Sequence, residues 1–337
     1  MRIDNPVKID VGSLESAATD PFFVIQFSRR SAYGPEILRE LDDACKVLGA
    51  RLEVRFYGHY DDAFDCHTLS SLPSVRFLAL DRLRHLTHLE LLGGMEQIES
   101  LSFGVFELKS PALLKFENVR RLRRLRLDDN RGNDVDLADL CHFSQLEELA
   151  IAGHRRNIDV LGELDGIAEL GLRGIPKIVN LDFVSTMIGL KRLSIILGGR
   201  TTLGKIRHAA LQHLELIRVR GLSNIEPGDF PALTNLSIED QVQLRQLDVG
   251  INRELKQLRI INCKSLNGLA GLDKLDRLET LILSRTSLDP AEIMNQKLSK
   301  SLRTMGLSGY GARRDREIET QLRSVGYRNP GYSALTS

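Results

Sequence analysis

The stretch LTNLSIEDQVQLRQLDVGINRELKQLRI, from Leu233 to Ile260, decides the fold. It contains three copies of the pattern L-x-x-L-x-L or a close variant, and their middle apolar residues stand at 236, 247 and 258. Side chains alternate between the two faces of a β-strand, so the middle and last apolar residues of each copy share one face. Each copy therefore predicts a short strand with one buried face.

The same pattern recurs along most of the chain in eleven main copies at a nearly constant spacing. Their middle apolar residues are Leu78, Leu101, Leu125, Leu149, Leu170, Leu193, Leu214, Leu236, Leu258, Leu281 and Met305. A single coil of this kind cannot bury its leucines alone, so neighbouring coils stack and share a continuous core. The short connections return the chain beside its previous strand, which predicts a parallel ladder.

A weaker apolar cluster lies about halfway round each coil. It repeats the full pattern at Leu86–Leu89–Leu91, where we expect all three leucines to be buried, and at Leu244–Leu247–Val249. No helical period of 3.6 residues persists on this side of the coils. We therefore expect extended segments or tight turns there instead of full helices.

Both ends of the chain break the period. Residues 22–27 and 51–56 predict strands on either side of a helix at 35–49, and residues 312–328 predict an amphipathic helix. Terminal repeats must shield an open core from water. The sequence thus predicts a β-α-β cap at 1–68, a repeat array at 69–310, and a capping helix and tail at 311–337.

Composition limits the function classes. The net charge of +1 argues against a nucleic-acid binder, which usually needs a basic field, and no run of 18 apolar residues predicts a membrane span. The four cysteines are scattered, which is typical of a reducing compartment. We expect a cytoplasmic monomer that binds neither nucleic acid nor membrane, or one translocated without a cleavable signal peptide.

The pattern resembles the leucine-rich repeat family, L-x-x-L-x-L-x-x-N/C-x-L, over about residues 69 to 310, and is most similar to short bacterial repeats with a nested half-repeat. The family's Asn/Cys position, five residues after the middle leucine, is kept in some coils and replaced in others. It is occupied by Asn130, His154, Ile175, Gly198, Gln241, Asn252, Cys263 and Thr286. The resemblance implies an α/β or β-rich solenoid of about eleven coils, in which Cys263 is buried and structural.

Candidate catalytic and metal-binding motifs are weak, so we expect no enzyme activity, no cofactor and no metal. His85 and His88 stand three residues apart with Glu90 nearby, but a third convergent ligand is not evident. The segment Gly199–Lys205 matches most of a phosphate-binding loop, yet Ile206 replaces the required hydroxyl residue.

A run of five arginines between 120 and 126 is the strongest local charge feature, at Arg120, Arg121, Arg123, Arg124 and Arg126. Acidic residues follow directly, and aromatic residues that could stack on bases are lacking. We interpret the run as a solvated or partner-facing surface.

Residues one before, one after and three after each middle leucine face outward. The predicted partner-binding set on this face is Arg124, Arg126, Asp128, Glu148, Glu169, Arg173, Arg192, His213, Glu215, Glu239 and Arg259. Mixed charges favour a protein partner over a polyanion. The leading hypothesis is a protein-recognition scaffold, either a bacterial effector or adaptor, or an immunity-type protein that neutralises a toxin.

Two other functions stay open. An enzyme site could lie in the cap around Tyr57, His59 and Asp61, where Tyr33 and Tyr60 add to a cluster of polar aromatic residues. The chain could also be a purely structural spacer.

Overall fold

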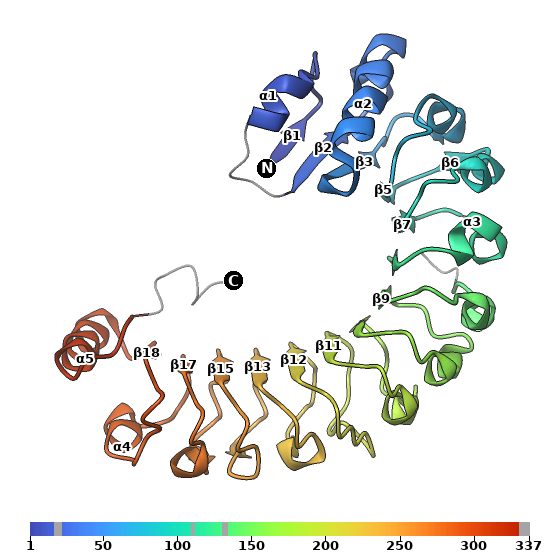
Figure 1. Ribbon diagram of the computed structural model, residues 1–337. Helices are drawn as coiled ribbons and strands as arrows, with labels where there is room; N and C mark the ends of the chain where they lie inside the picture. Colours follow the sequence, from blue (N-terminus) through green and yellow to red (C-terminus); the bar gives the residue numbers. More distant parts are fainter. Residues whose placement is uncertain (17–21, 109–111, 130–133, 330–337) are drawn as a thin grey trace. The chain divides into compact units, whose positions relative to one another are not determined.

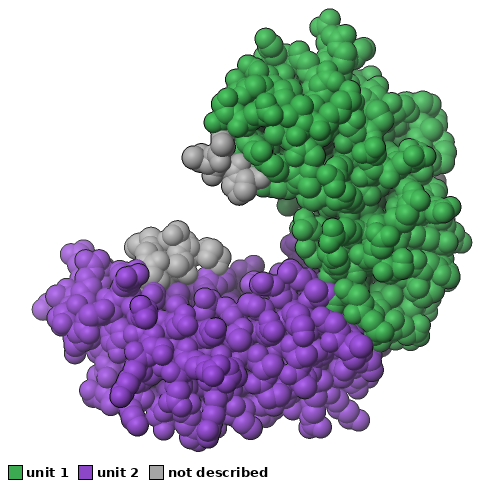
Figure 2. All heavy atoms as spheres, viewed as in Figure 1, with its two compact units in different colours: residues 1–167 green, residues 168–337 purple. Residues whose placement is uncertain are grey.

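The chain, described here by a computed structural model, forms two compact units, Met1–Ile167 and Ala168–Ser337 (Figure 2). The described residues are 1–16, 22–108, 112–129 and 134–329. The predicted ladder residue Asn130 and the tail at 330–337 lie outside them. Within the described residues, no helix is long and apolar enough to span a membrane.

Among its described residues, the first unit contains seven parallel strands of the ladder (Figure 1). In spatial order they are β1 (Arg2–Asp4), β2 (Phe23–Phe27), β3 (Leu52–Gly58), β5 (Phe77–Leu83), β7 (Ser100–Val105), β8 (Arg124–Leu127) and β9 (Glu148–Ala152). Val54 pairs with Leu78, and Leu78 pairs with Leu101. Residues that pair on adjacent strands are therefore one full repeat apart in the sequence. The ladder already begins inside the predicted cap.

The part of the second unit that the structure describes, residues 168–329, contains the other seven strands of this sheet, again parallel. They are β10 (Glu169–Arg173), β11 (Arg192–Ile196), β12 (His213–Ile217), β13 (Asn235–Glu239), β15 (Gln257–Ile261), β17 (Thr280–Ser284) and β18 (Thr304–Ser308). The middle leucines of successive copies pair with one another, from Leu170 with Leu193 to Leu281 with Met305. All eleven predicted copies are therefore strands, and the parallel ladder is confirmed.

The return side of the coils consists mostly of 3-10 turns, as expected from the missing helical period. These turns are η3 (Cys66–Ser71), η4 (Leu89–Gly94), η5 (Leu113–Lys115), η6 (Leu137–His142), η7 (Ile158–Glu163), η8 (Asp182–Thr186), η9 (Pro227–Asp229) and η10 (Leu272–Lys274). Two short helices also lie there, α3 (Glu117–Arg120) and α4 (Pro290–Met294).

Short strands pair on the return side in two places. These pairs are β4 (Phe64–Asp65) with β6 (Leu86–Thr87), and β14 (Gln246–Asp248) with β16 (Gly268–Ala270). The prediction that Leu86, Leu89 and Leu91 are buried is wrong, since all three are half-exposed. The chain turns into η4 here, and this turn brings Leu92 into the core instead.

The two ends match the predicted caps. Helix α2 (Pro35–Leu48) connects β2 to β3, with η1 (Arg30–Ala32) before it and η2 (Gly49–Arg51) after it, and α5 (Ala312–Ser324) follows β18. Strand β1 and helix α1 (Val11–Ser16) precede the predicted unit and were not expected. The rings of Phe27 and Phe56 stack at 5.5 Å in the core of this end, so aromatic packing supplements the leucine core there.

Buried polar side chains link successive coils at the position five residues after the middle leucine. Gln241 donates to the Leu216 carbonyl at 3.2 Å, and the Cys263 thiol lies 3.9 Å from the Ile238 carbonyl. On the return side Asn252 donates to the carbonyls of Pro227 and Phe230, both at 2.9 Å. The structural role expected for Cys263 is confirmed, and burial raises the pKa of its thiol to about 11, which disfavours the nucleophilic thiolate.

His154 takes the same position as a buried neutral histidine. Its Nε2 donates to the Asp128 carbonyl at 3.0 Å and its Nδ1 accepts from the Val135 amide at 3.1 Å. Burial lowers the pKa of His154 below its usual value. A protonated Nδ1 could no longer accept this hydrogen bond, so the fold requires the neutral ring.

This arrangement predicts acid sensitivity. The folded-state pKa of His154 lies below its unfolded value, so its contribution to stability is complete above the unfolded pKa of about 6.5 and falls as pH decreases through that value. We expect the urea midpoint to fall between about pH 7.5 and about pH 5.5, and less so in His154→Asn. An equal fall in both proteins would contradict this role.

Candidate binding face

All eleven predicted face residues are at least partly accessible. Strand alternation explains this, because in β12 the leucines Leu214 and Leu216 are buried while His213 and Glu215 point to the other face. The exposed members are Arg124, Arg126, Glu169, Arg173 and Arg192; the half-buried members are Asp128, Glu148, His213, Glu215, Glu239 and Arg259. The structure therefore places the whole set where a partner could reach it.

Several of these residues already pair with each other. Arg124 lies 2.8 Å from Glu148, and Arg192 lies 2.9 Å from Glu169, in each case on adjacent strands. All four side chains are about half exposed, and such pairs typically contribute only about 0–1 kcal/mol. A partner could therefore replace these contacts at small cost.

Other pairs are more shielded. Arg259 and Glu239 lie 3.1 Å apart with side chains only 19% and 25% exposed, and Ser194 donates to Glu215 at 2.6 Å. Burial and the nearby Arg192 lower the pKa of His213, which favours its neutral form at neutral pH. The contacts of Arg259 with Glu239 and of Ser194 with Glu215 are therefore more shielded from solvent than the exposed pair Arg192–Glu169.

The arginine run is neutralised largely by acidic residues of the next coil. Arg123 pairs with Glu147 at 2.7 Å, and Arg120 approaches Asp139 at 3.6 Å. Arg124 also lies in register with Glu148 of the next strand, and Arg126 pairs with Asp128, so the arginines do not act as one basic patch. This pairing weakens a phosphate-binding interpretation further.

The first strands extend the outward face, which sequence reasoning missed. Arg55 of β3 makes two hydrogen bonds to Asp81 of β5, at 2.7 and 2.8 Å, and its guanidinium lies 4.5 Å from the Tyr57 ring centroid. The spacing between Val54 and Leu78 equals one repeat, and this spacing could have revealed that the outward face continues into β3. The outward face therefore starts well before Arg124.

An aromatic cluster lies beside the arginines of the first unit. The ring centroids of Phe22 and Phe77 are 6.0 Å apart, and the Arg124 guanidinium lies 5.4 Å from the Phe77 centroid. Arginine and aromatic residues are enriched among the residues that dominate binding energy at protein interfaces. Phe22 and Arg124 are the exposed members of this group, whereas Phe77 is buried beneath them.

The alternative enzyme site does not assemble. His59 is buried, and both of its ring nitrogens are engaged: Nδ1 with the Tyr57 carbonyl at 2.9 Å and Nε2 with the Tyr33 hydroxyl at 3.1 Å. The Tyr57 side chain lies on the outward face, and Asp61 is exposed in a loop. His59 therefore serves as a core residue, at the position equivalent to His154.

A cavity of about 390 Å³ lies in the second unit between the last strands and α5. Its lining includes Ile261, Ser284 and Ser308, which occupy one outward row of β15, β17 and β18. Asp315 of α5 also lines it and accepts hydrogen bonds from the amides of Gly309 and Tyr310. The outward face is thus hollowed at its C-terminal end and bordered by a charged helix.

The histidines at 85 and 88 do not converge on one another. His85 Nε2 lies 3.4 Å from Glu107, whereas His88 Nδ1 lies 3.0 Å from Asp65 on the preceding coil. Sequence spacing within one coil could not predict this, because the relevant neighbours are about one repeat apart.

Comparison with known proteins supports the fold. No protein-family model matches the chain, and the search of curated proteins gives no match. Among solved structures, an internalin (inlF) from Listeria monocytogenes is 15% identical and matches 92% of this chain and 86% of its own, with a TM-score of 0.55.

Two further structures are similar at lower scores. A chain of the mouse RP105/MD-1 complex is 15% identical, with 92% of this chain matching 57% of that one at a TM-score of 0.49. The functional domain of InlJ from Listeria monocytogenes is 17% identical, with coverages of 90% and 67% and a TM-score of 0.41. The repeat, the parallel strands and the likeness to the first internalin identify the fold of this chain as a leucine-rich repeat solenoid.

Proposed function

We propose that the chain is a protein-recognition scaffold whose partner protein binds along the outward face of the ladder. The observation that carries this proposal is the accessible polar side chains at matching register on successive strands, such as Arg192, His213 and Asn235. Adjacent strands lie about 4.8 Å apart. The face therefore offers many modest contacts in a fixed array, which suits an extended protein surface.

Charge supports a protein as partner. In the first unit the predicted set contains two arginines and two acidic residues, and in the second it contains three of each. A balanced pattern of this kind gives specificity for a complementary surface, whereas polyanions require a net positive field. Binding would replace the exposed pairs Arg124–Glu148 and Arg192–Glu169 with contacts to the partner.

Two roles fit such a scaffold: a bacterial effector or adaptor that engages a host or regulatory protein, and an immunity-type protein that neutralises a toxin. We propose that it acts as a monomer in the cytoplasm or after translocation. A toxin gene beside the coding sequence would favour the immunity role, and its absence in several related genomes would favour the effector or adaptor role.

The face is tested by removing four of its charges together. We expect a variant with alanine at Arg126, Glu148, Arg173 and Glu215 to lose capture of the partner in a quantitative pull-down while its circular dichroism is unchanged. Arg126 and Arg173 are exposed, and Glu148 and Glu215 are half-buried. Ion pairs at such positions contribute little to stability, so the fold should tolerate removal of these side chains.

A matched control removes the same charges elsewhere. Alanine at Arg121, Glu163, Lys177 and Glu292 removes two positive and two negative charges from exposed positions outside the ladder strands. This control should retain the partner. Equal capture by both variants, with the fold intact, would exclude the proposed face.

A further inference from the structure

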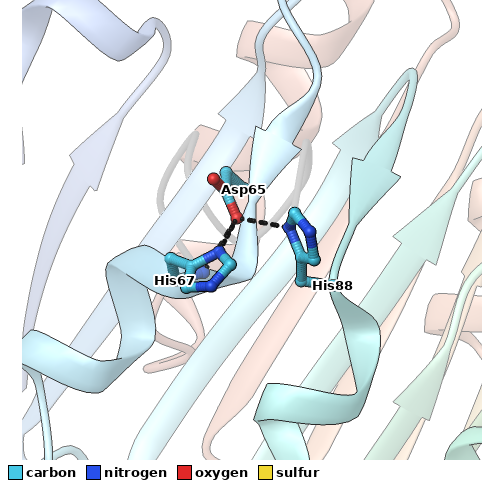
Figure 3. Close-up of side chains that lie close together, drawn as sticks. All are labelled: Asp65, His67 and His88. Carbon is cyan, nitrogen blue, oxygen red and sulfur yellow. Dashed lines mark hydrogen bonds and ion pairs between the residues drawn. The ribbon is translucent and has the colours of Figure 1, made fainter.

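Two histidines and an aspartate converge on the return side of the first unit (Figure 3). Asp65 ends β4, His67 lies in η3, and His88 follows β6, which pairs with β4. Asp65 Oδ1 lies 2.9 Å from His67 Nδ1 and 3.0 Å from His88 Nδ1. The three potential ligand atoms all lie within 4.8 Å of one another, although their residues come from adjacent coils.

The backbone holds this arrangement in place. Asp65 accepts the His67 amide at 3.0 Å as the N-cap of η3, and His88 is the N-cap residue of η4. His88 adopts φ +55°, a left-handed conformation that is uncommon and strained for residues other than glycine. Both histidines are therefore placed by the ends of regular elements and not by mobile loops.

The geometry points to a metal site: we propose that Asp65, His67 and His88 bind a divalent transition-metal ion of the zinc type. Zinc prefers four ligands in a tetrahedron at about 2.0–2.1 Å, which sets ligand atoms about 3.3 Å apart. The present separations of 2.9 and 3.0 Å are a few tenths of an ångström shorter. A small rotation of the side chains would open the central position.

The donor set suits this ion. Two imidazoles and one carboxylate are typical zinc ligands, and three protein ligands leave a fourth position for water or for a group from another molecule. The side chains of the three residues are 44% to 62% exposed, so an ion can enter from solvent.

Bound metal would link two successive coils. The segment 64–67 belongs to one coil and 86–88 to the next, and their strand pairing at this point is two residues long. A shared ion would fasten this short pair. This role is independent of the partner-binding face, because the cluster lies among the 3-10 turns on the other side of the coil.

Zinc binding by the metal-free full-length chain tests the proposal, measured by competition with a chromophoric chelator. We expect one equivalent to bind at micromolar concentration or below, and His67→Ala and His88→Ala each to weaken binding by about tenfold or more. Cobalt in place of zinc should give the visible absorption of a tetrahedral site. Binding only at millimolar concentration would exclude the site.

Controls separate a built site from general surface binding. His85→Ala removes an exposed histidine of the same coil and should leave the affinity unchanged. Asp65→Asn keeps an oxygen that can accept the His67 amide hydrogen bond, so it should preserve the fold while lowering the affinity for zinc. Equal losses in His85→Ala and His88→Ala would overturn the proposal.

Hydrogen exchange gives a second readout. Zinc should slow exchange of the amides in η3 and η4 of the wild-type chain but not of His88→Ala. Slowing that is equally large in both would also contradict a site at these residues.

Discussion

Gly271→Ala is expected to lower the free energy of unfolding by about 2–5 kcal/mol. Gly271 has φ +83°, and a methyl group there would lie 2.3 Å from the Gly250 Cα and amide nitrogen. A left-handed alanine costs about 1–2 kcal/mol, and forcing extra atoms into a packed site adds about 1–3 kcal/mol. The contact is with backbone, so no side-chain rotation can relieve it.

The reason lies in the stacking of the nested half-coils. Strands β14 and β16 pair through Leu247 and Leu269, and Gly250 and Gly271 follow within two residues of their ends on adjacent coils. The return side of this region is therefore so tightly stacked that Gly271 has no room for a side chain, whereas a carbon added at Gly250 would lie 3.0 Å from the Lys274 side chain. The sequence shows both glycines but not that they touch.

Gly174→Ala provides the matched control. Gly174 also has a positive φ, +69°, but a methyl group there would meet no atom within 4 Å. It should therefore lose only the conformational part, about 1–2 kcal/mol. Urea unfolding of the three proteins would measure both effects, and an equal loss in the two variants would show that the close approach to Gly250 does not matter.

The strands of the ladder were predictable because a short local sequence pattern specifies each of them. Leucines at L-x-x-L-x-L spacing specify a strand and its buried face, and the regular recurrence of this pattern specifies the stacking, so all eleven strands follow from the sequence. The turn after each strand was not predictable. The residue four after the middle leucine is left-handed in many coils, yet it is Leu197, Arg218 or Arg285 as readily as glycine.

The candidate sites show the same division. The accessible set on the outward face follows from strand alternation, which the sequence displays. The pairing of Arg124 with Glu148 depends on register, and the convergence of Asp65 with His88 depends on how two return segments pair. Both are contacts between residues about one repeat apart, and no local pattern encodes them.

Asn252→Ala is expected to lower the free energy of unfolding by about 1–3 kcal/mol, since it removes two buried hydrogen bonds and each contributes about 0.5–1.5 kcal/mol. Asn252 is fully buried, and its amide group serves the carbonyls of Pro227 and Phe230 on the preceding coil. Alanine would remove both side-chain hydrogen bonds between the coils, while each carbonyl would keep only its bond from a backbone amide of its own coil, Phe230 N–H to Pro227 and Leu233 N–H to Phe230.

The equivalent residue of the first unit makes the argument general. Asn118 is buried and donates to the carbonyls of Leu92 and Met95 at 2.8 and 3.1 Å, the same relation to its preceding coil. Asn118→Ala should therefore cost a similar amount, whereas exposed Asn295→Ala should cost little. Hydrogen exchange would locate each loss, with faster exchange in the turn whose carbonyls accept these hydrogen bonds. If Asn252→Ala and Asn295→Ala had the same urea midpoint, these asparagines would not be the links that hold the return side of one coil to the next.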